Sequence, residues 1–356
     1  MTLEHAEQAR RFERLANAPM DIARLPDKVL EALRRVVQFD AFCWGAVDPA
    51  SLLPTRATGT TIPHTTPLIW EVHELAARGV VPRDVRPLAR SGRHVARMSE
   101  IVDERSERHA VYQRVLAPNG LEHQLRAALV ADGTHWGLLH IERRRPSFTS
   151  SEIVLVDTLV PHLAHALRRW LLADGNDATG ARSPAVPGVI VLDRDNEIDS
   201  ISTEAEHWLS EWGFADLKRP PSAIAAVVGT ARARTDRNHD ETIPSARVRI
   251  PTGTWLHVRA TDLTRSDRKP RTAILLERAS HDHVAPLIAR AHQLSHRETQ
   301  IALLVVRGLS TSEIAAKLFI SPYTVQDHLK SIFEKVGVRS RRELATDIFG
   351  PHLHAA

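Results

Sequence analysis

The C-terminal part of the chain, from residue 295 onward, carries helix-start signals at four places. A serine stands three residues before a glutamate in three pairs: Ser295–Glu298, Ser310–Glu313 and Ser340–Glu343. In such a capping box, each of the two side chains satisfies a backbone N–H at the start of a helix. The fourth start is Ser321-Pro322, where serine caps the helix and proline occupies its first position. The sequence therefore predicts four short helices between residues 295 and 349.

The connections between these helices restrict how they can pack. Apolar residues recur at helical spacing inside each helix, and Gly308 ends the first one. Only Phe319 and Ile320 lie between the second helix and the Ser321 cap. A turn of this length forces the second and third helices to cross sharply, which is the geometry of a helix-turn-helix.

The third predicted helix carries polar residues off its apolar seam: Tyr323, Thr324, Gln326, Asp327 and Lys330. Such a helix fits the major groove of DNA, where glutamine can pair with adenine, aspartate can accept from cytosine and lysine can reach guanine. Together with Lys330, four basic residues at the exit of this helix outnumber the single acid there, Glu334, and would bind phosphates: Lys335, Arg339, Arg341 and Arg342. We therefore expect double-stranded DNA as a partner. The alternative is a solvated four-helix bundle with a charged surface. Such a bundle requires neither the polar residues of the third helix nor the basic residues that follow it.

The segment LSHRETQIALLVVRGLSTSEIAAKLFISPYTVQDHLKSIFEKVGVRSRREL, residues 294–344, resembles the C-terminal domain of LuxR-type regulators. The family's spacing is carried by Glu298, Gly308, Ile314-Ala315, Ser321, Thr324-Val325, His328, Ile332, Lys335, Val338, Arg341 and Glu343-Leu344. The resemblance implies that the third helix reads bases, that Thr324 and Lys330 contact DNA, and that Lys335 and Arg341 stand near the DNA backbone.

Two positions depart from the family pattern. Many members carry a basic residue where Gln326 stands and an uncharged one where Asp327 stands, so the base preference cannot be carried over. His328 falls beside the apolar seam, where a packed, hydrogen-bonded histidine is favoured over a base-reading one.

Length and composition bound the rest of the chain. At 356 residues the chain is expected to form three domains, and 43% hydrophobic with 25% charged residues is the balance of a soluble globular protein. The single cysteine, Cys43, excludes a disulfide framework and a CxxC zinc site, and we expect it to be a buried core thiol. No apolar run is long enough to span a bilayer and no secretory signal begins the chain, so a cytoplasmic protein without membrane contact is expected.

The region before the C-terminal domain divides at a linker. Residues 1–172 are predicted to combine helices with strands, including a hairpin turning at Asp132-Gly133. Residues 173–187, ADGNDATGARSPAVP, have the composition of a linker. Residues 188–280 are predicted to form five strands and two helices, and residues 281–293 to connect them to the domain at 294–356. The predicted fold is therefore multidomain α+β, followed by an all-α domain.

Both upstream regions resemble sensor folds. LAPNGLEHQLRAALVADGTHWGLLHIERRRPSFTSSE is similar to part of a GAF domain, and PGVIVLDRDNEIDSISTEAEHWL is more weakly similar to part of a PAS-like domain. These resemblances imply antiparallel sheets flanked by helices, with room for a small molecule. No residue identifies a ligand, and neither a cofactor nor a metal is expected: His281-Asp282-His283 has no third ligand nearby, and Asp193 lacks the setting of a phosphoacceptor.

Together these features predict a one-component transcriptional regulator that binds promoter DNA as a homodimer and responds to a small-molecule effector, with RNA polymerase as a further candidate partner. One alternative is that the upstream domains serve only as a dimerisation or protein-interaction scaffold. The other is an enzyme in the GAF-like or PAS-like region, which would need convergent catalytic residues that the sequence does not show.

Overall fold

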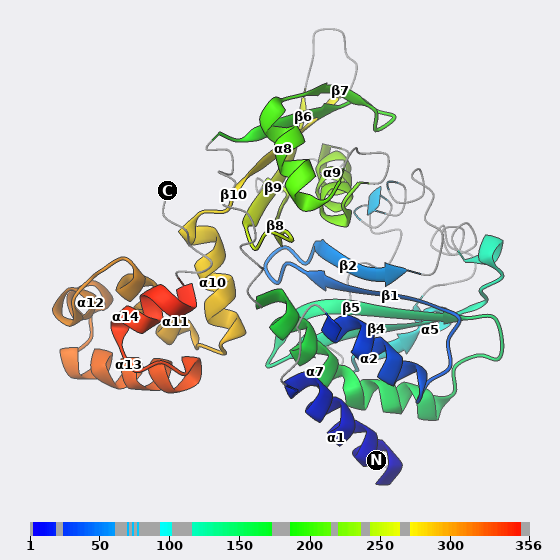
Figure 1. Cartoon of the computed structure of the whole chain (residues 1–356), viewed down its shortest axis with the longest axis horizontal. Helices are drawn as coiled ribbons and strands as arrows, with labels where there is room; N and C mark the ends of the chain where they lie inside the picture. The colour runs from blue at the N-terminus through cyan, green and yellow to red at the C-terminus, as the bar shows by residue number, and fades with distance from the viewer. Residues whose placement is uncertain are drawn as a thin grey trace. The chain divides into compact units, whose positions relative to one another are not determined.

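The computed structural model describes residues 3–18, 24–60, 70, 73–74, 77, 93–101, 116–172, 186–214, 220–235, 243–263 and 271–349. They fall into two compact units (Figure 1). The first contains most of two five-stranded antiparallel sheets. The second contains the helices from residue 278 onward together with the turn segment 249–256. Among the helices in these ranges, none has the length and apolar character needed to cross a membrane.

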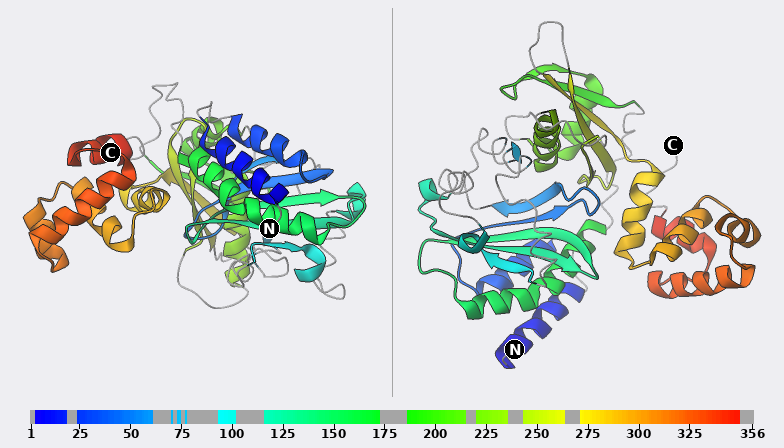
Figure 2. Two further views of the ribbon diagram at one scale, coloured as in Figure 1. Left: turned by 90° about the horizontal axis from the view of Figure 1, so that it is seen from below. Right: turned by 180° about the vertical axis from the view of Figure 1, so that it is seen from behind.

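The first sheet has the strand order β2-β1-β5-β4-β3. Its strands are β1 (Ala41–Val47), β2 (Pro54–Thr60), β3 (Val95–Arg97), β4 (His123–Ala131) and β5 (Thr134–Arg143). Three helices cover one face, α1 (Leu3–Asn17), α2 (Leu25–Arg34) and α7 (Ser150–Leu172), as Figures 1 and 2 show. The shorter helices α5 (Met98–Ile101) and η2 (Ala117–Asn119) precede β4.

The predicted hairpin between β4 and β5 is confirmed. Asp132 and Gly133 have φ of 52° and 68°, the left-handed pair that a tight two-residue hairpin needs. Close packing of α7 on the sheet requires Gly137 in β5, because a Cβ there would lie 2.1 Å from the Leu167 side chain and 2.3 Å from the Gly45 oxygen.

The second sheet has the order β7-β6-β10-β9-β8. Its strands are β6 (Gly188–Leu192), β7 (Ile198–Ile201), β8 (Ser245–Arg249), β9 (Trp255–Leu263) and β10 (Arg271–Arg278). Two helices, α8 (Thr203–Trp212) and α9 (Ser222–Thr235), lie between β7 and β8 in the chain. The strand and helix numbers match the expectation for residues 188–280, and each sheet places its strands in the same order relative to the chain.

Helix α9 is buried on every side along its first half. Residues 223–228 are at most 1% exposed, which is the mark of a helix enclosed by other elements. One of its neighbours is β2 of the first sheet. On the same helix, a Cβ at Gly229 would lie 2.9 Å from backbone atoms of His73 and Glu74. The two sheets are therefore parts of one compact unit, although residues 173–185 of the predicted linker lie outside the described residues.

A buried ion pair also joins the two sheets. Asp48, directly after β1, is 3% exposed and accepts hydrogen bonds from the Arg247 backbone N at 2.9 Å and from its Nε at 2.8 Å. The Arg247 Nη2 lies 2.5 Å from the other Asp48 oxygen. Burial opposes ionisation of Asp48, but the Arg247 contacts outweigh it and lower the pKa of that carboxyl.

The second unit consists of short helices around one small core. They are α10 (His281–Ala291), α11 (His296–Val306), α12 (Thr311–Leu318), α13 (Pro322–Val336) and α14 (Arg341–Glu343), which continues into a π-helical segment, Leu344–Phe349. The first three helices predicted after residue 295 are present. The fourth starts where expected, but it is a single turn followed by the wider π-helical segment rather than one regular α-helix.

Candidate nucleic-acid interface

The helix starts are capped largely as the sequence predicts. Ser295 Oγ accepts from the Glu298 backbone N at 3.2 Å, and Glu298 accepts from the Ser295 N at 2.6 Å. Ser310 and Glu313 make the same pair of bonds at 3.3 and 2.7 Å. At the last start Ser340 accepts from the Glu343 N at 3.1 Å, but the Glu343 carboxylate accepts from the preceding backbone N, that of residue 339. Three of the four starts therefore form as predicted, and the fourth is a variant of the box.

The turn between α12 and α13 has the predicted length. Phe319 takes a left-handed conformation, φ 54° and ψ 46°, and ends α12. The Ile320 N donates to the Ala315 oxygen at 3.1 Å. Ser321 then caps α13 by accepting from the Thr324 N at 3.0 Å. This arrangement brings α12 and α13 into contact and forms a helix-turn-helix.

Helix α13 separates an apolar face from a polar one. Its buried residues are Val325, Leu329, Ile332 and Val336. Four of the five predicted base-reading residues are exposed, namely Tyr323, Gln326, Asp327 and Lys330, and the fifth, Thr324, is half-buried with Oγ1 2.9 Å from Ser321 Oγ. Gln326 also donates to Thr311 Oγ1 at 3.3 Å. His328 is half-buried, as expected for a side chain beside the seam.

Two of the four predicted phosphate-binding residues have partners inside the domain. Lys335 Nζ lies 2.6 Å from Glu298 Oε2, and Ser331 donates to Glu298 Oε1 at 2.6 Å. Arg341 donates to the Leu309 oxygen and to Thr311 Oγ1, both at 2.9 Å. Lys335 thus ties α13 to α11, and Arg341 ties α14 to the start of α12.

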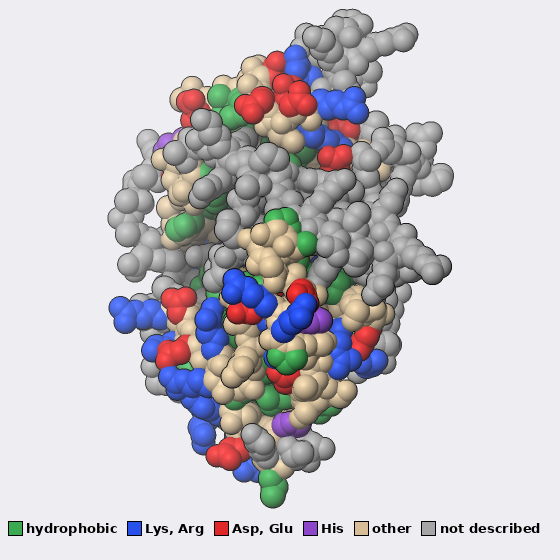
Figure 3. Space-filling view, turned by 90° about the vertical axis from the view of Figure 1, so that its right-hand side faces the viewer, with side chains coloured by type: hydrophobic (Ala, Val, Ile, Leu, Met, Phe, Trp, Pro, Cys, Tyr) green, Lys and Arg blue, Asp and Glu red, His purple; other side chains and the backbone are tan. Residues whose placement is uncertain are grey.

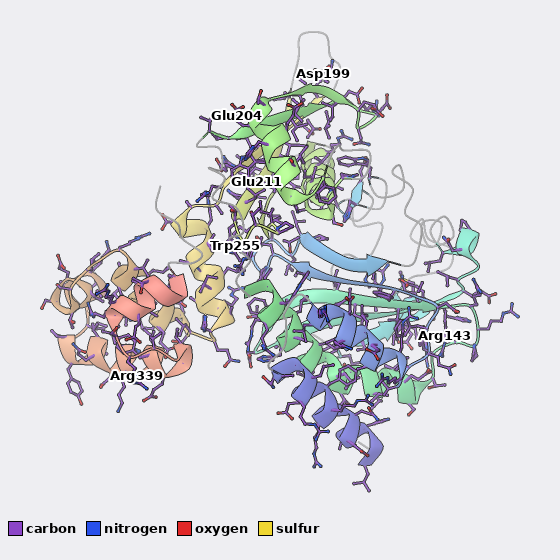
Figure 4. The ribbon with its side chains drawn as sticks, viewed as in Figure 1. Arg143, Asp199, Glu204, Glu211, Trp255 and Arg339 are labelled. Carbon is purple, nitrogen blue, oxygen red and sulfur yellow. The ribbon has the colours of Figure 1, made fainter. Side chains whose placement is uncertain are left out.

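The other two, Arg339 and Arg342, are exposed. Arg339 follows the end of α13 in the chain and is labelled near that helix in Figure 4. Within the described ranges no hydrogen bond or ion pair holds either guanidinium. They therefore remain available to a phosphate, whereas Lys335 and Arg341 are engaged in holding the helices together.

Glu298 combines two tasks in this domain. Its side chain is only 5% exposed, and it caps α11 while accepting from Lys335 and Ser331. Burial alone would raise its pKa, but these hydrogen bonds outweigh burial and lower the pKa of Glu298 to about 2. The carboxylate is therefore ionised throughout the physiological range.

A polar row on the first sheet is a feature that the sequence reasoning missed. On the face opposite α7, Glu142 accepts from Gln124 Nε2 at 2.7 Å, and Gln124 accepts from Arg126 Nε at 2.7 Å. Cys43 and His140 are paired across neighbouring strands beside them. The first three are at most 7% exposed, whereas Cys43 and His140 are half-buried. The signal was present as polar residues two positions apart, Gln124 and Arg126 in β4 and His140 and Glu142 in β5.

Burial controls the ionisation of this row. It raises the pKa of Glu142 to about 7 against the bond from Gln124 and the charge of Arg126. It raises the pKa of the Cys43 thiol to about 12, lowers that of Arg126 to about 10 and lowers that of His140 well below its usual value. The thiol is therefore protonated at neutral pH, but Cys43 is half-buried beside polar side chains rather than in the apolar core, where it was expected. Among the described residues no partner contacts Glu142 Oε2.

No metal site appears in the described part of the chain, where no group of three histidine, cysteine, aspartate or glutamate side chains could hold an ion. On the face drawn in Figure 3, basic and acidic side chains of the described residues are interspersed rather than gathered by sign. The uncompensated cations considered above, Arg339 and Arg342, belong to the C-terminal helical domain.

Comparison with known proteins gives two family matches. The model of the bacterial regulatory proteins of the luxR family matches residues 292–347, and that of the GAF domain matches residues 21–167. The sequence-based resemblances for these two regions are thus confirmed. Neither match extends over residues 188–280.

Individual relatives cover very different shares of the chain. An HTH-type transcriptional regulator of Mycobacterium bovis is 43% identical over 54 residues, 15% of this chain and 6% of that protein, so this chain spans only a small part of that relative. The solved structure of SdiA from Escherichia coli is 12% identical, covering 98% of this chain and 99% of that chain with a TM-score of 0.37, which is too low to carry a functional argument.

The spore germination protein GerE of Bacillus subtilis is a much shorter relative. It is 36% identical over 55 residues, which make up 15% of this chain and 74% of GerE. The length of this match is close to that of the luxR-family match to residues 292–347. Through residues 292–347, this chain belongs to the luxR family of bacterial regulatory proteins.

Proposed function

We propose that this protein is a transcriptional regulator whose C-terminal domain binds promoter DNA as a homodimer. The observation that carries the proposal is the exposed polar side of α13, which projects from a helix-turn-helix with its apolar side fully packed. A helix presented in this way can enter the major groove and meet base edges. Family membership of residues 292–347 supports the same conclusion.

The residues divide into three roles under this proposal. Tyr323, Thr324, Gln326, Asp327 and Lys330 face the bases. Arg339 and Arg342 bind phosphates, because their charges are exposed and uncompensated within the described chain. Lys335 and Arg341 hold α13 and α14 in place through Glu298, Leu309 and Thr311, and any contact they make with the DNA backbone is secondary to that.

The test is selection of bound duplexes from a random pool by the full chain, followed by affinity measurement over a range of salt concentrations. We expect an inverted-repeat motif, because a symmetric dimer reads two half-sites. Lys330→Ala should weaken binding and relax the preference at one position, whereas Arg342→Ala should weaken binding on all sequences and reduce the salt slope by about one unit. Arg35→Ala, far from α13 in the chain, is the matched charge control. Absence of duplex binding at low salt would refute the proposal.

We further propose that the GAF domain senses a small molecule on the polar face of its sheet. Burying Arg126, Gln124 and Glu142 on one face costs free energy that a wholly apolar face would avoid. One buried polar atom on this face, Glu142 Oε2, has no partner among the described residues. A ligand that supplies that partner would offset part of the cost. Residues 188–280 are proposed to be a PAS-like domain, supported by their five-stranded antiparallel sheet with two helices.

Sensing is distinguished from scaffolding by one measurement on the full chain and one on a chain without the upstream domains. Native mass spectrometry should detect a retained small molecule in the wild-type protein and lose it in Glu142→Ala, while Glu122→Ala, on the exposed end of the same region, should retain it. If the upstream domains are a scaffold alone, no variant retains a small molecule. Deleting these domains then abolishes dimerisation, and adding cell extract changes DNA binding no more in the full chain than in the deletion variant.

A further inference from the structure

Phe319 is a large apolar residue that the fold leaves outside. Its side chain is 95% exposed, and it occupies the turn between α12 and α13. Tyr323, in the first turn of α13, is 76% exposed. The two aromatic rings therefore flank the N-terminal end of α13, which is the end of a recognition helix that approaches the bases.

Folding does not account for this phenylalanine. Its backbone lies in the left-handed region, with φ of 54°, where glycine and asparagine are favoured and a bulky side chain adds strain. The cap is made by backbone groups, since the Phe319 and Ile320 N–H groups donate to oxygens of residues 316 and 315. Any residue other than proline could supply those bonds. An exposed ring in a strained conformation, with no packing gain, is the kind of exception that occurs at functional sites.

The neighbours of the ring suit a nucleic acid better than an apolar protein surface. Lys317 and Lys330, one on each helix that meets at this turn, are exposed, and in the described chain neither makes an ion pair. Ser321, which caps α13, is exposed as well. These neighbours suit the major groove of DNA. The lysines and the serine hydroxyl could contact phosphates along its edges, and the Phe319 ring could contact an apolar group on its floor.

We propose that Phe319 packs against the 5-methyl group of a thymine in the major groove and so determines a preference for thymine at one position of each half-site. The methyl of thymine is the apolar feature that base edges present in the major groove, and phenylalanine is among the side chains that contact it. The inference rests on the proposed DNA-binding function, to which it adds a specificity residue outside α13.

The experiment uses the full chain and the duplex selected by the wild type, in which each thymine is replaced in turn by deoxyuridine. That replacement removes one methyl group and leaves every hydrogen bond of the base unchanged. For the wild type we expect one position per half-site at which affinity falls about fourfold, the value for a single buried methyl group. The Phe319→Asn variant should bind the thymine duplex more weakly and lose the difference between thymine and deoxyuridine at that position alone.

Asparagine is the sharper substitution because it suits the left-handed cap, so loss of folding cannot explain the result. Tyr323→Ala is the matched aromatic control and should keep the deoxyuridine effect at the Phe319 position. The salt slope should be the same for wild type and Phe319→Asn, because no charge changes. Undiminished affinity in Phe319→Asn, or a deoxyuridine effect that persists in it, overturns the inference and leaves the DNA-binding proposal intact. Failure of the wild type to bind any duplex refutes both.

Discussion

Replacing Glu298 by glutamine should open the helix-turn-helix while leaving the rest of the protein folded. The carboxylate caps α11 and accepts from Lys335 and Ser331 on α13, with both side-chain contacts at 2.6 Å. Lowering its pKa from 4.5 to about 2 corresponds to about 3 kcal/mol, at about 1.4 kcal/mol for each pH unit. Glutamine keeps the size of the side chain and removes the charge, so most of that free energy should be lost at neutral pH.

Hydrogen exchange of the full chain, read by mass spectrometry, can localise this loss. We expect amides of α11 and α13 to exchange about 100-fold faster in Glu298→Gln than in the wild type at pH 7, while peptides from the two sheets are unchanged. Because the folded-state pKa is depressed, the stabilisation is complete above pH 4.5 and disappears as the pH falls toward 2. A change of less than about threefold at pH 7 would show that the carboxylate does not couple α11 to α13.

Three other substitutions test the interactions that hold the protein together. Asp48→Ala leaves the buried Arg247 guanidinium without its carboxylate and should lower the unfolding free energy by about 3–5 kcal/mol, measured by tryptophan-monitored denaturation. Glu31→Ala, which removes an exposed ion pair, should change the unfolding free energy little. Equal effects of the two substitutions would contradict this reasoning. Glu142 has a raised pKa of about 7, so the wild type should lose about 3 kcal/mol of stability as the pH rises from 4.5 to 7, and Glu142→Gln should remove that dependence; an unchanged pH profile would contradict it. Arg341→Ala should speed amide exchange in α12 and α14, because it removes the bonds to Leu309 and Thr311. It should change the salt slope of DNA binding less than Arg342→Ala does. A larger change in salt slope for Arg341→Ala would make Arg341 chiefly a phosphate contact.

The C-terminal domain could be predicted closely because its signals are local. Each cap joins residues three apart, such as Ser310 and Glu313, and the turn length follows from the position of Ser321. The β4–β5 hairpin was predicted for the same reason, since Asp132-Gly133 specifies its own turn. The last helix was predicted less well, because its cap indicates where it starts but not how regularly it continues.

The roles of Lys335 and Arg341 could not be predicted from local pattern. Lys335 meets Glu298 across 37 positions of sequence, and Arg341 meets Leu309 across 32. A sequence shows that such residues are basic, but not whether a buried acceptor has already engaged them. The expected cluster of four phosphate-binding cations is therefore divided by tertiary contacts into two engaged side chains and two exposed ones, Arg339 and Arg342.

The burial of α9 on all sides also depends on tertiary contacts, so it could not be predicted from the sequence. Its run of small apolar residues predicts a helix, but only the three-dimensional arrangement shows the first sheet's β2 beside it. With the Asp48–Arg247 pair, this packing makes the two sheets parts of one unit. A ligand that shifted the first sheet would therefore disturb buried contacts of the second, which gives the proposed sensing a route that flexible linkage of two independent domains would lack.

Two residues that folding alone does not explain, Glu142 and Phe319, have roles in the proposed function. Most of the large side chains on the α7 side of the first sheet are apolar and packed, and they need no further account. On its other face Glu142 keeps an unpartnered oxygen in the interior, and at the helix-turn-helix Phe319 keeps a strained backbone and an exposed ring. The buried Glu142 carboxyl costs stability that an apolar side chain on that face would not cost. The left-handed Phe319 costs stability that asparagine at the same position would not cost. Glu142 lies in the GAF domain, and Phe319 lies in the turn before α13. Replacing Glu142 by glutamine, which keeps the bond from Gln124, and Phe319 by asparagine should each stabilise its own domain. The first change should impair ligand retention and the second thymine preference, and a stabilising substitution without such a loss would show that the residue is not needed for that function.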